Sequence, residues 1–260
     1  METSEFMHRS TAEPRRLPNA SRTLLLIARR GALEALRDRM TLMMSLFFSL
    51  VFPIFMVVTT VVPTAHKSGS DAESTLAGVL AIYLLIIGLM PSTAAVGIAS
   101  GQFAGEKEQG ILTPLLATPA SNFAIFGGKV IGAIIPAIIF SIVAELIYVL
   151  SIVLLTGAHT LGLLSLWMAL AMVALVPATS LFAVTVASLI SSRVRTFNTA
   201  QQISGFALFP LWGVIIGLGY ELQHNGLVLA VFVVTLFVVD VVMTYVAAST
   251  WSREEVLAKL

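Results

Sequence analysis

The stretch Val130–Leu155, VIGAIIPAIIFSIVAELIYVLSIVLL, is apolar apart from a few hydroxyl side chains and one carboxylate, Glu145. About 20 predominantly apolar residues are enough for an α-helix to cross the hydrocarbon core of a bilayer. Five further stretches have the same character: Leu42–Val62, Leu76–Ser100, Leu163–Ile190, Ile203–Leu218 and Leu227–Ser249. We therefore expect an all-α membrane protein with six transmembrane helices.

The composition of the chain agrees with this expectation. Of the 260 residues, 57% are hydrophobic and 11% are charged, whereas about a quarter of the residues in a soluble domain are charged. A soluble globular enzyme is therefore disfavoured. The chain has no cysteine, which excludes a disulfide framework and a thiolate metal site. Its four histidines are not in metal-ligand spacing, so no metal site is expected.

The fifth apolar stretch is the weakest of the six. It is short, and Pro210, Gly213 and Gly217 interrupt it. Broken segments at membrane depth are tolerated where protein buries the freed backbone groups. The sequence therefore leaves open whether this span is continuous or partly re-entrant.

Lys and Arg are distributed very unevenly between the predicted loops. Fourteen lie before the first span, in the second–third and fourth–fifth connections and in the C-terminal tail, and only Lys67 lies on the opposite side. Cytoplasmic loops carry the excess of Lys and Arg. Both termini are therefore predicted to lie in the cytoplasm, with the protein in the cell's inner (plasma) membrane. Residues 1–20 are predicted to be a disordered tail, and residues 21–260 the transmembrane domain.

The segment from Ser21 to Met40 has the pattern of an amphipathic basic helix. Small and apolar residues fall near one face, and the polar side carries five arginines: Arg22, Arg29, Arg30, Arg37 and Arg39. Such a helix is suited to lie along an anionic lipid surface. We interpret it as a helix that lies along the membrane surface before the first span, or as an anchor that orients this span, and the two interpretations are compatible.

A short polar island, GEKEQGILTPLLATP at Gly105–Pro119, separates the second span from the third. Glu106 and Glu108 suit the start of a helix. An apolar surface is offered by three leucines: Leu112, Leu115 and Leu116. Pro114 predicts a break in the helix, and Thr118-Pro119 is typical of the N-cap and first position of the helix that enters the third span. On composition alone, a solvated loop explains the island equally well.

The island resembles the cytoplasmic signature of the ABC-2 family of ATP-binding-cassette transporter permeases, GEKE-x-G-x-L-x-x-LL-x-x-P between the second and third spans. The matching residues are Gly105, Glu106, Lys107, Glu108, Gly110, Leu112, Leu115, Leu116 and Pro119. Two further stretches are similar to the family: Ser192–Gln202 before the fifth span and Trp251–Leu257 after the sixth.

This resemblance implies the permease subunit of an ATP-driven exporter, in which the residues from Gly105 to Leu116 form a coupling helix on a separate ATPase. It also implies that the segment from Ser21 to Met40 is the interfacial elbow helix before the first span. It also implies two ATPase subunits and a second permease copy or a related permease. The chain has no G-x-x-x-x-G-K-[ST] phosphate loop. We therefore expect that it is not an enzyme and binds no cofactor, and that ATP and Mg are bound by the partner ATPase. Membrane lipid is a further expected partner, and nucleic acid is not.

Glu145 and Asp240 are the ionisable residues within the predicted spans. An acid at bilayer depth is costly and suggests a functional site. Each either lines a translocation route or is a protonated carboxyl group bonded to a hydroxyl group, such as that of Ser141 or Tyr245. Both acids would also serve an ion-coupled secondary transporter, which is the alternative function. A membrane-embedded enzyme is disfavoured, because the chain has no H-E-x-x-H or G-x-S-x-G motif.

Two further patterns lie within or beside the spans. Small residues recur at helix spacing, which allows close helix contact inside the subunit or at a dimer seam; the pairs are Gly128/Gly132, Ala137/Ser141 and Gly213/Gly217. The cluster of Met40, Met43 and Met44 at the entrance of the first span is interpreted as apolar filling rather than a metal site. The apolar character of the spans favours an amphiphilic or hydrophobic cargo.

Overall fold

The structure, a computed structural model, describes residues 20–69, 71–111 and 120–250, and every regular element in these ranges is a helix. Six helical runs are long and apolar enough to cross a membrane: Arg39–Ala65, Ala72–Glu108, Asn122–Thr156, Leu166–Arg193, Phe197–Gly217 and Gly226–Ser249. These runs confirm the predicted fold class and contain nearly all of the six predicted stretches. The predicted tail, apart from Ala20, and the Trp251–Leu257 stretch lie outside the described residues.

The first two spans are assembled from several shorter elements. After α1 (Ala20–Ala35), the first span comprises α2 (Arg39–Leu46), the π-helix η1 (Phe47–Val51), α3 (Phe52–Met56), the π-helix η2 (Val57–Val61) and α4 (Val62–Ala65). Each π-helical turn of the first span comes just before a proline, Pro53 or Pro63. The wider turn accommodates a residue that cannot donate the regular backbone hydrogen bond.

The second span comprises α5 (Ala72–Leu89), α6 (Ser92–Ser100), the π-helix η3 (Gly101–Gly105) and α7 (Glu106–Glu108). The remaining elements are α9 (Asn122–Thr156), the 3-10 helix η4 (Ala158–Leu163), α10 (Leu166–Arg193), α11 (Phe197–Gly217), α12 (Gly219–His224) and α13 (Gly226–Thr250). The fifth span, α11, is one unbroken helix despite Pro210. It begins six residues before the predicted start. The hydropathy pattern missed these residues because the first turns of the helix are polar.

Polar side chains begin the helices. Asp38 accepts a hydrogen bond from the backbone N–H of Thr41 at 2.9 Å. Hydrogen bonding to the side chain of Thr41, and then to this N–H group, lowers the pKa of Asp38. Ser121 caps α9 in the same way, which corrects the predicted N-cap at Thr118. The helix predicted to run from Ser21 to Met40 is likewise wrong in its extent, since α1 ends at Ala35 and Asp38 starts a new helix.

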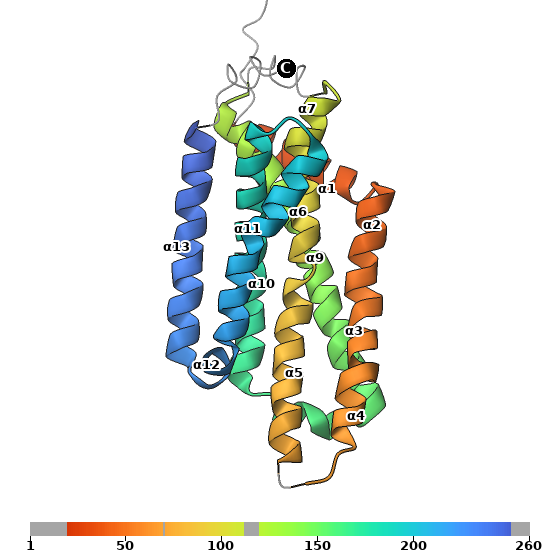
Figure 1. Ribbon diagram of the computed structural model, residues 1–260. Helices are drawn as coiled ribbons and strands as arrows, with labels where there is room; N and C mark the ends of the chain where they lie inside the picture. The colour runs from red at the N-terminus through yellow and green to blue at the C-terminus, as the bar shows by residue number, and fades with distance from the viewer. Residues whose placement is uncertain (1–19, 70, 112–119, 251–260) are drawn as a thin grey trace, which may run out of the picture.

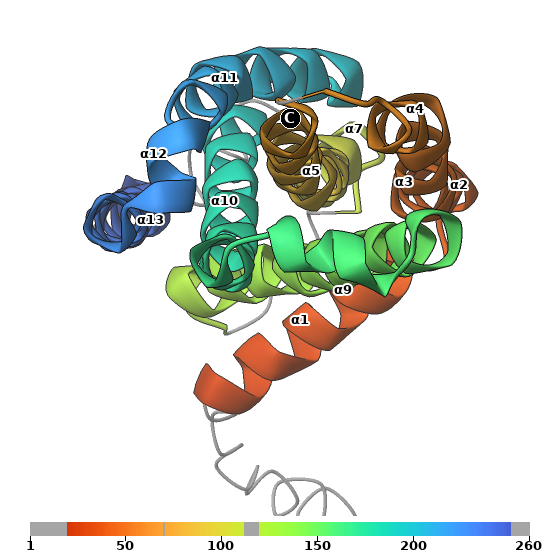
Figure 2. The same cartoon turned by 90° about the horizontal axis from the view of Figure 1, so that it is seen from below.

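The spans form one bundle with α10 at its centre, in contact with α6, α9, α11 and α13 (Figures 1 and 2). We call its two ends the α1–α7 end and the α4–α12 end, after the helices that lie there in Figure 1. One apolar core cluster includes Phe103 and Phe126, and a second includes Leu80 and Tyr148. Hydrogen bonds also join the spans, such as the one from the Tyr148 hydroxyl to the Leu80 carbonyl at 2.9 Å.

Helix α1 crosses the α1–α7 end beside α9, whereas α13 is drawn end-on in the same view (Figure 2). The contact is close because Gly128 and Gly132 lie in it. A Cβ atom at Gly128 would lie 2.8 Å from Cβ of Ile27, and one at Gly132 would lie 2.8 Å from the carbonyl oxygen of Ala28. Gly127 and Gly128 both lie inside α9.

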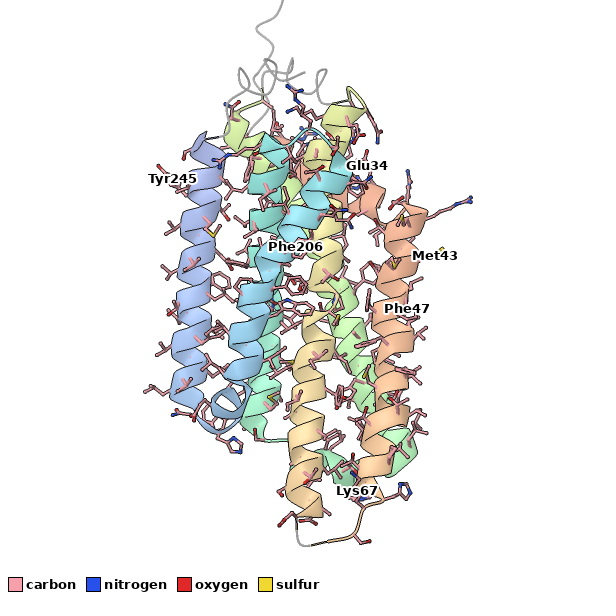
Figure 3. All side chains as sticks on the ribbon, viewed as in Figure 1. Glu34, Met43, Phe47, Lys67, Phe206 and Tyr245 are labelled. Carbon is pink, nitrogen blue, oxygen red and sulfur yellow. The ribbon has the colours of Figure 1, made fainter. Side chains whose placement is uncertain are left out.

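Large apolar side chains cover the outside of the bundle. Met43 and Phe47 of the first span, Phe206 of α11 and Tyr245 of α13 project outward (Figure 3). In water such a surface would be an aggregation hazard, whereas lipid solvates it. This distribution supports an integral membrane protein.

Candidate functional site

The first part of the polar island continues the helix of the second span. Gly105 ends η3, and Glu106, Lys107 and Glu108 form α7, so the two glutamates lie at the end of the second span and not at the start of a new helix. The backbone N–H groups of Gly110 and Ile111 then donate to the carbonyl groups of Lys107 and Glu106, at 3.1 and 2.9 Å. These two bonds form a Schellman motif with Gly110 in the left-handed region, at φ 70°. This geometry explains why the island has a glycine there.

A buried lysine joins the island to the third span. The Lys129 ammonium lies 2.6 Å from Oε2 of Glu106 and also donates to the backbone carbonyl of Gln102. It lies 5.0 Å from the centre of the Phe103 ring, and its side chain is only 3% exposed. A buried ammonium needs such partners because it has lost its water. The sequence placed Lys129 in a loop, but the structure places it inside α9 and buried.

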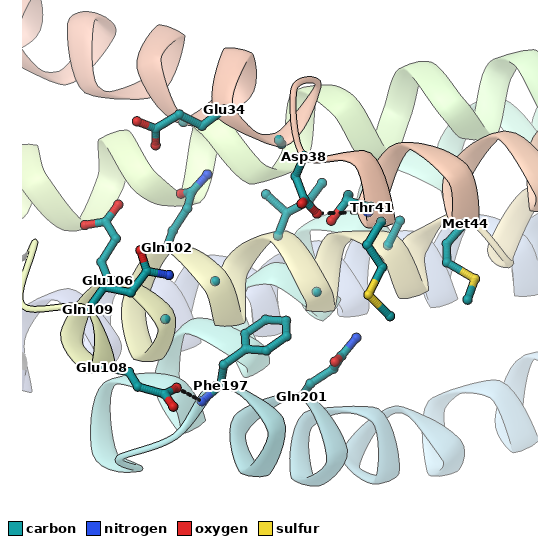
Figure 4. A pocket seen from close by; sticks show the side chains of 18 of the residues that line it. Glu34, Asp38, Thr41, Met44, Gln102, Glu106, Glu108, Gln109, Phe197 and Gln201 are labelled. Atoms are coloured by element: carbon teal, nitrogen blue, oxygen red, sulfur yellow. Dashed lines mark hydrogen bonds between the residues drawn. The ribbon is translucent and has the colours of Figure 1, made fainter.

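The island is also joined to the fifth span. Oε2 of Glu108 accepts a hydrogen bond from the backbone N–H of Phe197 at 3.0 Å (Figure 4). Phe197 is the first residue of α11, and Thr196 is the N-cap of this helix. A carboxylate at this position suits the positive end of the helix dipole. Glu106 and Glu108 thus connect the start of the island to α9 and α11.

The remaining predicted coupling residues differ in exposure. Lys107 is buried, with 6% of its surface exposed, so its side chain contacts the interior of this chain. Gln109, Gly110 and Ile111 are exposed. The predicted apolar contacts Leu112, Leu115 and Leu116 lie outside the described residues, as do Pro114 and the predicted break before it.

A cavity of about 990 Å³ opens between α1, α2, the α6–α7 segment and the start of α11. Figure 4 shows Glu34 and Asp38 on one side of it and Glu108 and Phe197 on the other. Arg30 also lines the cavity, and its Nε lies 2.7 Å from Oε1 of Glu34. This hydrogen bond raises the pKa of Arg30, to which Glu106 adds a smaller Coulombic effect. The sequence did not predict this cavity, because its residues come from four separate segments.

The arginines of the predicted elbow are all exposed: Arg22, Arg29, Arg30, Arg37 and Arg39. Ala28, Gly31 and Ala35 lie on the buried side of α1. The segment is therefore amphipathic, as predicted, although Arg39 belongs to α2. The lipid contact of α1 stays a prediction.

The two acids within the spans lie apart from the island contacts. Oε1 of Glu145 is buried against Gly88, where an added Cβ atom would lie 2.5 Å away. Asp240 is fully buried. Within the described ranges, neither Oε1 of Glu145 nor either carboxylate oxygen of Asp240 has a hydrogen-bond partner. The structure therefore shows neither a bond between the two acids nor a bond from Asp240 to Tyr245.

No group of three or more metal-ligating side chains occurs in the part of the chain that the structure describes. The arrangement at the α1–α7 end is instead suited to transmitting movement between helices and to binding a ligand. Its carboxylates link an exposed tip to two spans, and its cavity lies beside that link.

Comparison with known families gives one finding. The family model described as ABC-2 type transporter matches residues 19–214, which include α1, the first four spans and most of α11. A comparison with curated proteins gave no match. Because the family model covers more than half of the chain, and six apolar helices accompany it, this chain belongs to the ABC-2 type transporter family and is a membrane-spanning permease subunit of an ABC transporter.

Proposed function

We propose that this permease exports its substrate, and that a separate ATPase drives it through the island that begins at Gly105. The observation that carries the proposal is the pair of contacts from α7: Glu106 with Lys129 of α9, and Glu108 with the first N–H group of α11. A force on the exposed tip at Gln109–Ile111 would reach two spans through these contacts.

In this proposal, Glu106 and Glu108 also transmit motion. Both carboxylates have partners inside the chain, and movement of the docked tip would reach α9 and α11 through them. The docking surface is the exposed tip, including Ile111, which is 42% exposed, together with the leucines that follow it in sequence. ATP and Mg belong to two ATPase subunits, and a second permease copy completes the route.

The position of the cavity supports export. It opens at the α1–α7 end, where the basic residues of α1 and of the second–third and fourth–fifth connections gather, so the positive-inside rule places this end in the cytoplasm. Substrate would enter from the side on which the ATPase binds ATP. Helix α1 would lie along the inner membrane surface, with its arginines toward the lipid headgroups.

The test is co-purification from native membranes of the wild type, of Ile111→Asp and of the control Lys67→Asp, which changes the opposite end. A charge buried in the docking surface should cost more than about 1.4 kcal/mol and lower the yield of ATPase at least about tenfold. Lys67→Asp should retain the wild-type yield. The proposal fails if no ATPase accompanies the wild type, or if Ile111→Asp retains it fully.

The buried carboxylate of Asp240 favours a second candidate, an ion-coupled transporter, because an acid without a partner in the described structure could bind a proton or cation. Its test is uptake or efflux driven by an ion gradient in proteoliposomes that contain the purified permease and no ATP. Transport lost in Asp240→Asn would support this candidate, and gradient-independent transport would contradict it.

A further inference from the structure

The cavity at the α1–α7 end is rich in negative charge. Four carboxylates line it, from Glu34, Asp38, Glu106 and Glu108, against the single guanidinium of Arg30. Lys129, which does not line the cavity, pairs with Glu106. The four carboxylates therefore exceed the positive charges of Arg30 and Lys129 together. A cation in the cavity would therefore be attracted, and an anion repelled.

A buried amide in the cavity wall has unused hydrogen-bonding capacity. Gln102 is only 6% exposed, and in the described part of the chain neither its amide oxygen nor its amide nitrogen has a hydrogen-bond partner. Figure 4 shows its side chain extending toward α1 and Glu34. It lies where Gly31 leaves room, since a Cβ atom there would lie 2.6 Å from Nε2. Leaving such a group unpaired is costly, so its acceptor oxygen points to a ligand that donates a hydrogen bond.

The other wall of the cavity is apolar. Met40, Met44 and Phe48 line it from the first span, and Phe197 lines it from α11. Met40 is 70% exposed and lies at the start of the first span, beside the surface that lipid would cover. Methionine side chains adapt to ligands of different shape. This wall would suit an apolar tail that arrives from the membrane.

We propose that the cavity binds an amphiphilic organic cation, whose primary ammonium or guanidinium head donates to the amide oxygen of Gln102 while its tail lies against Met40, Met44 and Phe197. The proposal rests on the proposed export function, since it names the chemical class of the cargo. A bare metal ion fits less well, because no set of three acidic or imidazole ligands converges in the described ranges.

The experiment is a fluorescence titration of the permease in phosphatidylcholine nanodiscs with dansylcadaverine, which carries a primary ammonium at neutral pH and an apolar fluorophore. Empty nanodiscs correct for partition into lipid. The N-acetylated probe has the same tail without the charge. Pentylamine has the head with only a short tail, and because it carries no fluorophore its affinity is measured by displacement of dansylcadaverine. Saturable binding of dansylcadaverine, at least tenfold tighter than that of either analogue, is expected. Equal binding of the neutral analogue would overturn the proposal.

Three variants of lining residues locate the site. Gln102→Leu and Glu34→Gln should each weaken binding of dansylcadaverine, by about tenfold and a few-fold respectively, whereas Arg30→Gln should strengthen it. Size-exclusion profiles and melting curves check that each variant is folded. If Gln102→Leu does not fold, the opposite shifts expected for Glu34→Gln and Arg30→Gln decide the matter. Unchanged affinity in both exposed variants would overturn the assignment to this cavity.

This titration needs no ATPase and no transport. Binding with the expected variant effects, but without a co-purified ATPase, would retain the site and contradict the proposed function. A co-purified ATPase without saturable binding would retain the function and remove amphiphilic cations as its cargo.

Discussion

At the scale of single residues, Lys129 is the side chain on which the coupling depends most. Its ammonium is almost completely buried and contacts a carboxylate, a backbone carbonyl and an aromatic ring at the junction of the second and third spans. A lysine has three donors and no acceptor, so these contacts use most of its capacity. The hydropathy pattern could not reveal this role, because a Lys just before an apolar stretch is typical of a loop charge.

We expect Lys129→Met and Glu106→Gln each to lower the free energy of unfolding by about 3 kcal/mol, because each leaves one partner of a largely buried pair alone. The double variant should lose little more than either single variant, since no unpaired charge remains. The measurement is a double-mutant cycle of unfolding in detergent. Strictly additive losses would show that the two side chains do not interact.

At the scale of elements, the described start of the island, Gly105–Ile111, is a helix end with a defined stop. The second span continues to Glu108, and the turn after it is closed by Gly110. Glu108 then reaches the start of α11. The tip is therefore held in a fixed position relative to two spans, which a lever requires.

Gly110→Ala should lower the free energy of unfolding by about 1 kcal/mol, because a side chain is disfavoured in the left-handed region, and it should reduce the yield of co-purified ATPase. The control is Gly162→Ala in η4, an exposed position where φ is not positive and no neighbouring atom lies within 4 Å of the added Cβ atom. Its effect should stay within about 0.5 kcal/mol. A neutral Gly110→Ala would contradict a functional role for the fixed turn. Unfolding curves and co-purification give the two readouts.

The sequence was sufficient to predict the six spans, because length and hydropathy determine which segments can cross a bilayer. It was less reliable at the polar ends of the helices. The start of α11 and the end of the second span read as loops, since Asn198, Gln201 and Glu106 are polar although they are helical. The cavity could not be predicted at all, because its acids and Gln102 meet only when four segments pack together.

At the scale of the whole molecule, the two ends of the bundle differ in both charge and shape. The α1–α7 end holds the arginine-rich α1, the described start of the island and the cavity. Lys67 lies at the α4–α12 end (Figure 3). At Gly213 and Gly217 of α11, an added Cβ atom would meet no described atom of another element within 4 Å, unlike at Gly128 and Gly132. This leaves α11 available for the dimer seam that one interpretation of the small-residue pairs predicted.

The chain has no native cysteine, so single cysteines can report its orientation without background. In intact cells, a membrane-impermeant maleimide should label Lys67→Cys and should leave Arg195→Cys unlabelled until the membrane is opened. Both side chains are exposed, so access alone distinguishes them. Labelling of Arg195→Cys in intact cells would contradict the predicted topology and the predicted direction of transport.

The most direct test of the coupling is a photo-crosslinking residue introduced at Ile111, with the same residue at Lys67 as the control. After irradiation of native membranes, we predict a covalent adduct between position 111 and a soluble ABC ATPase, and none from position 67. An adduct that never contains an ATPase, or one that forms equally from both positions, would contradict the claim that the island receives the force of ATP hydrolysis.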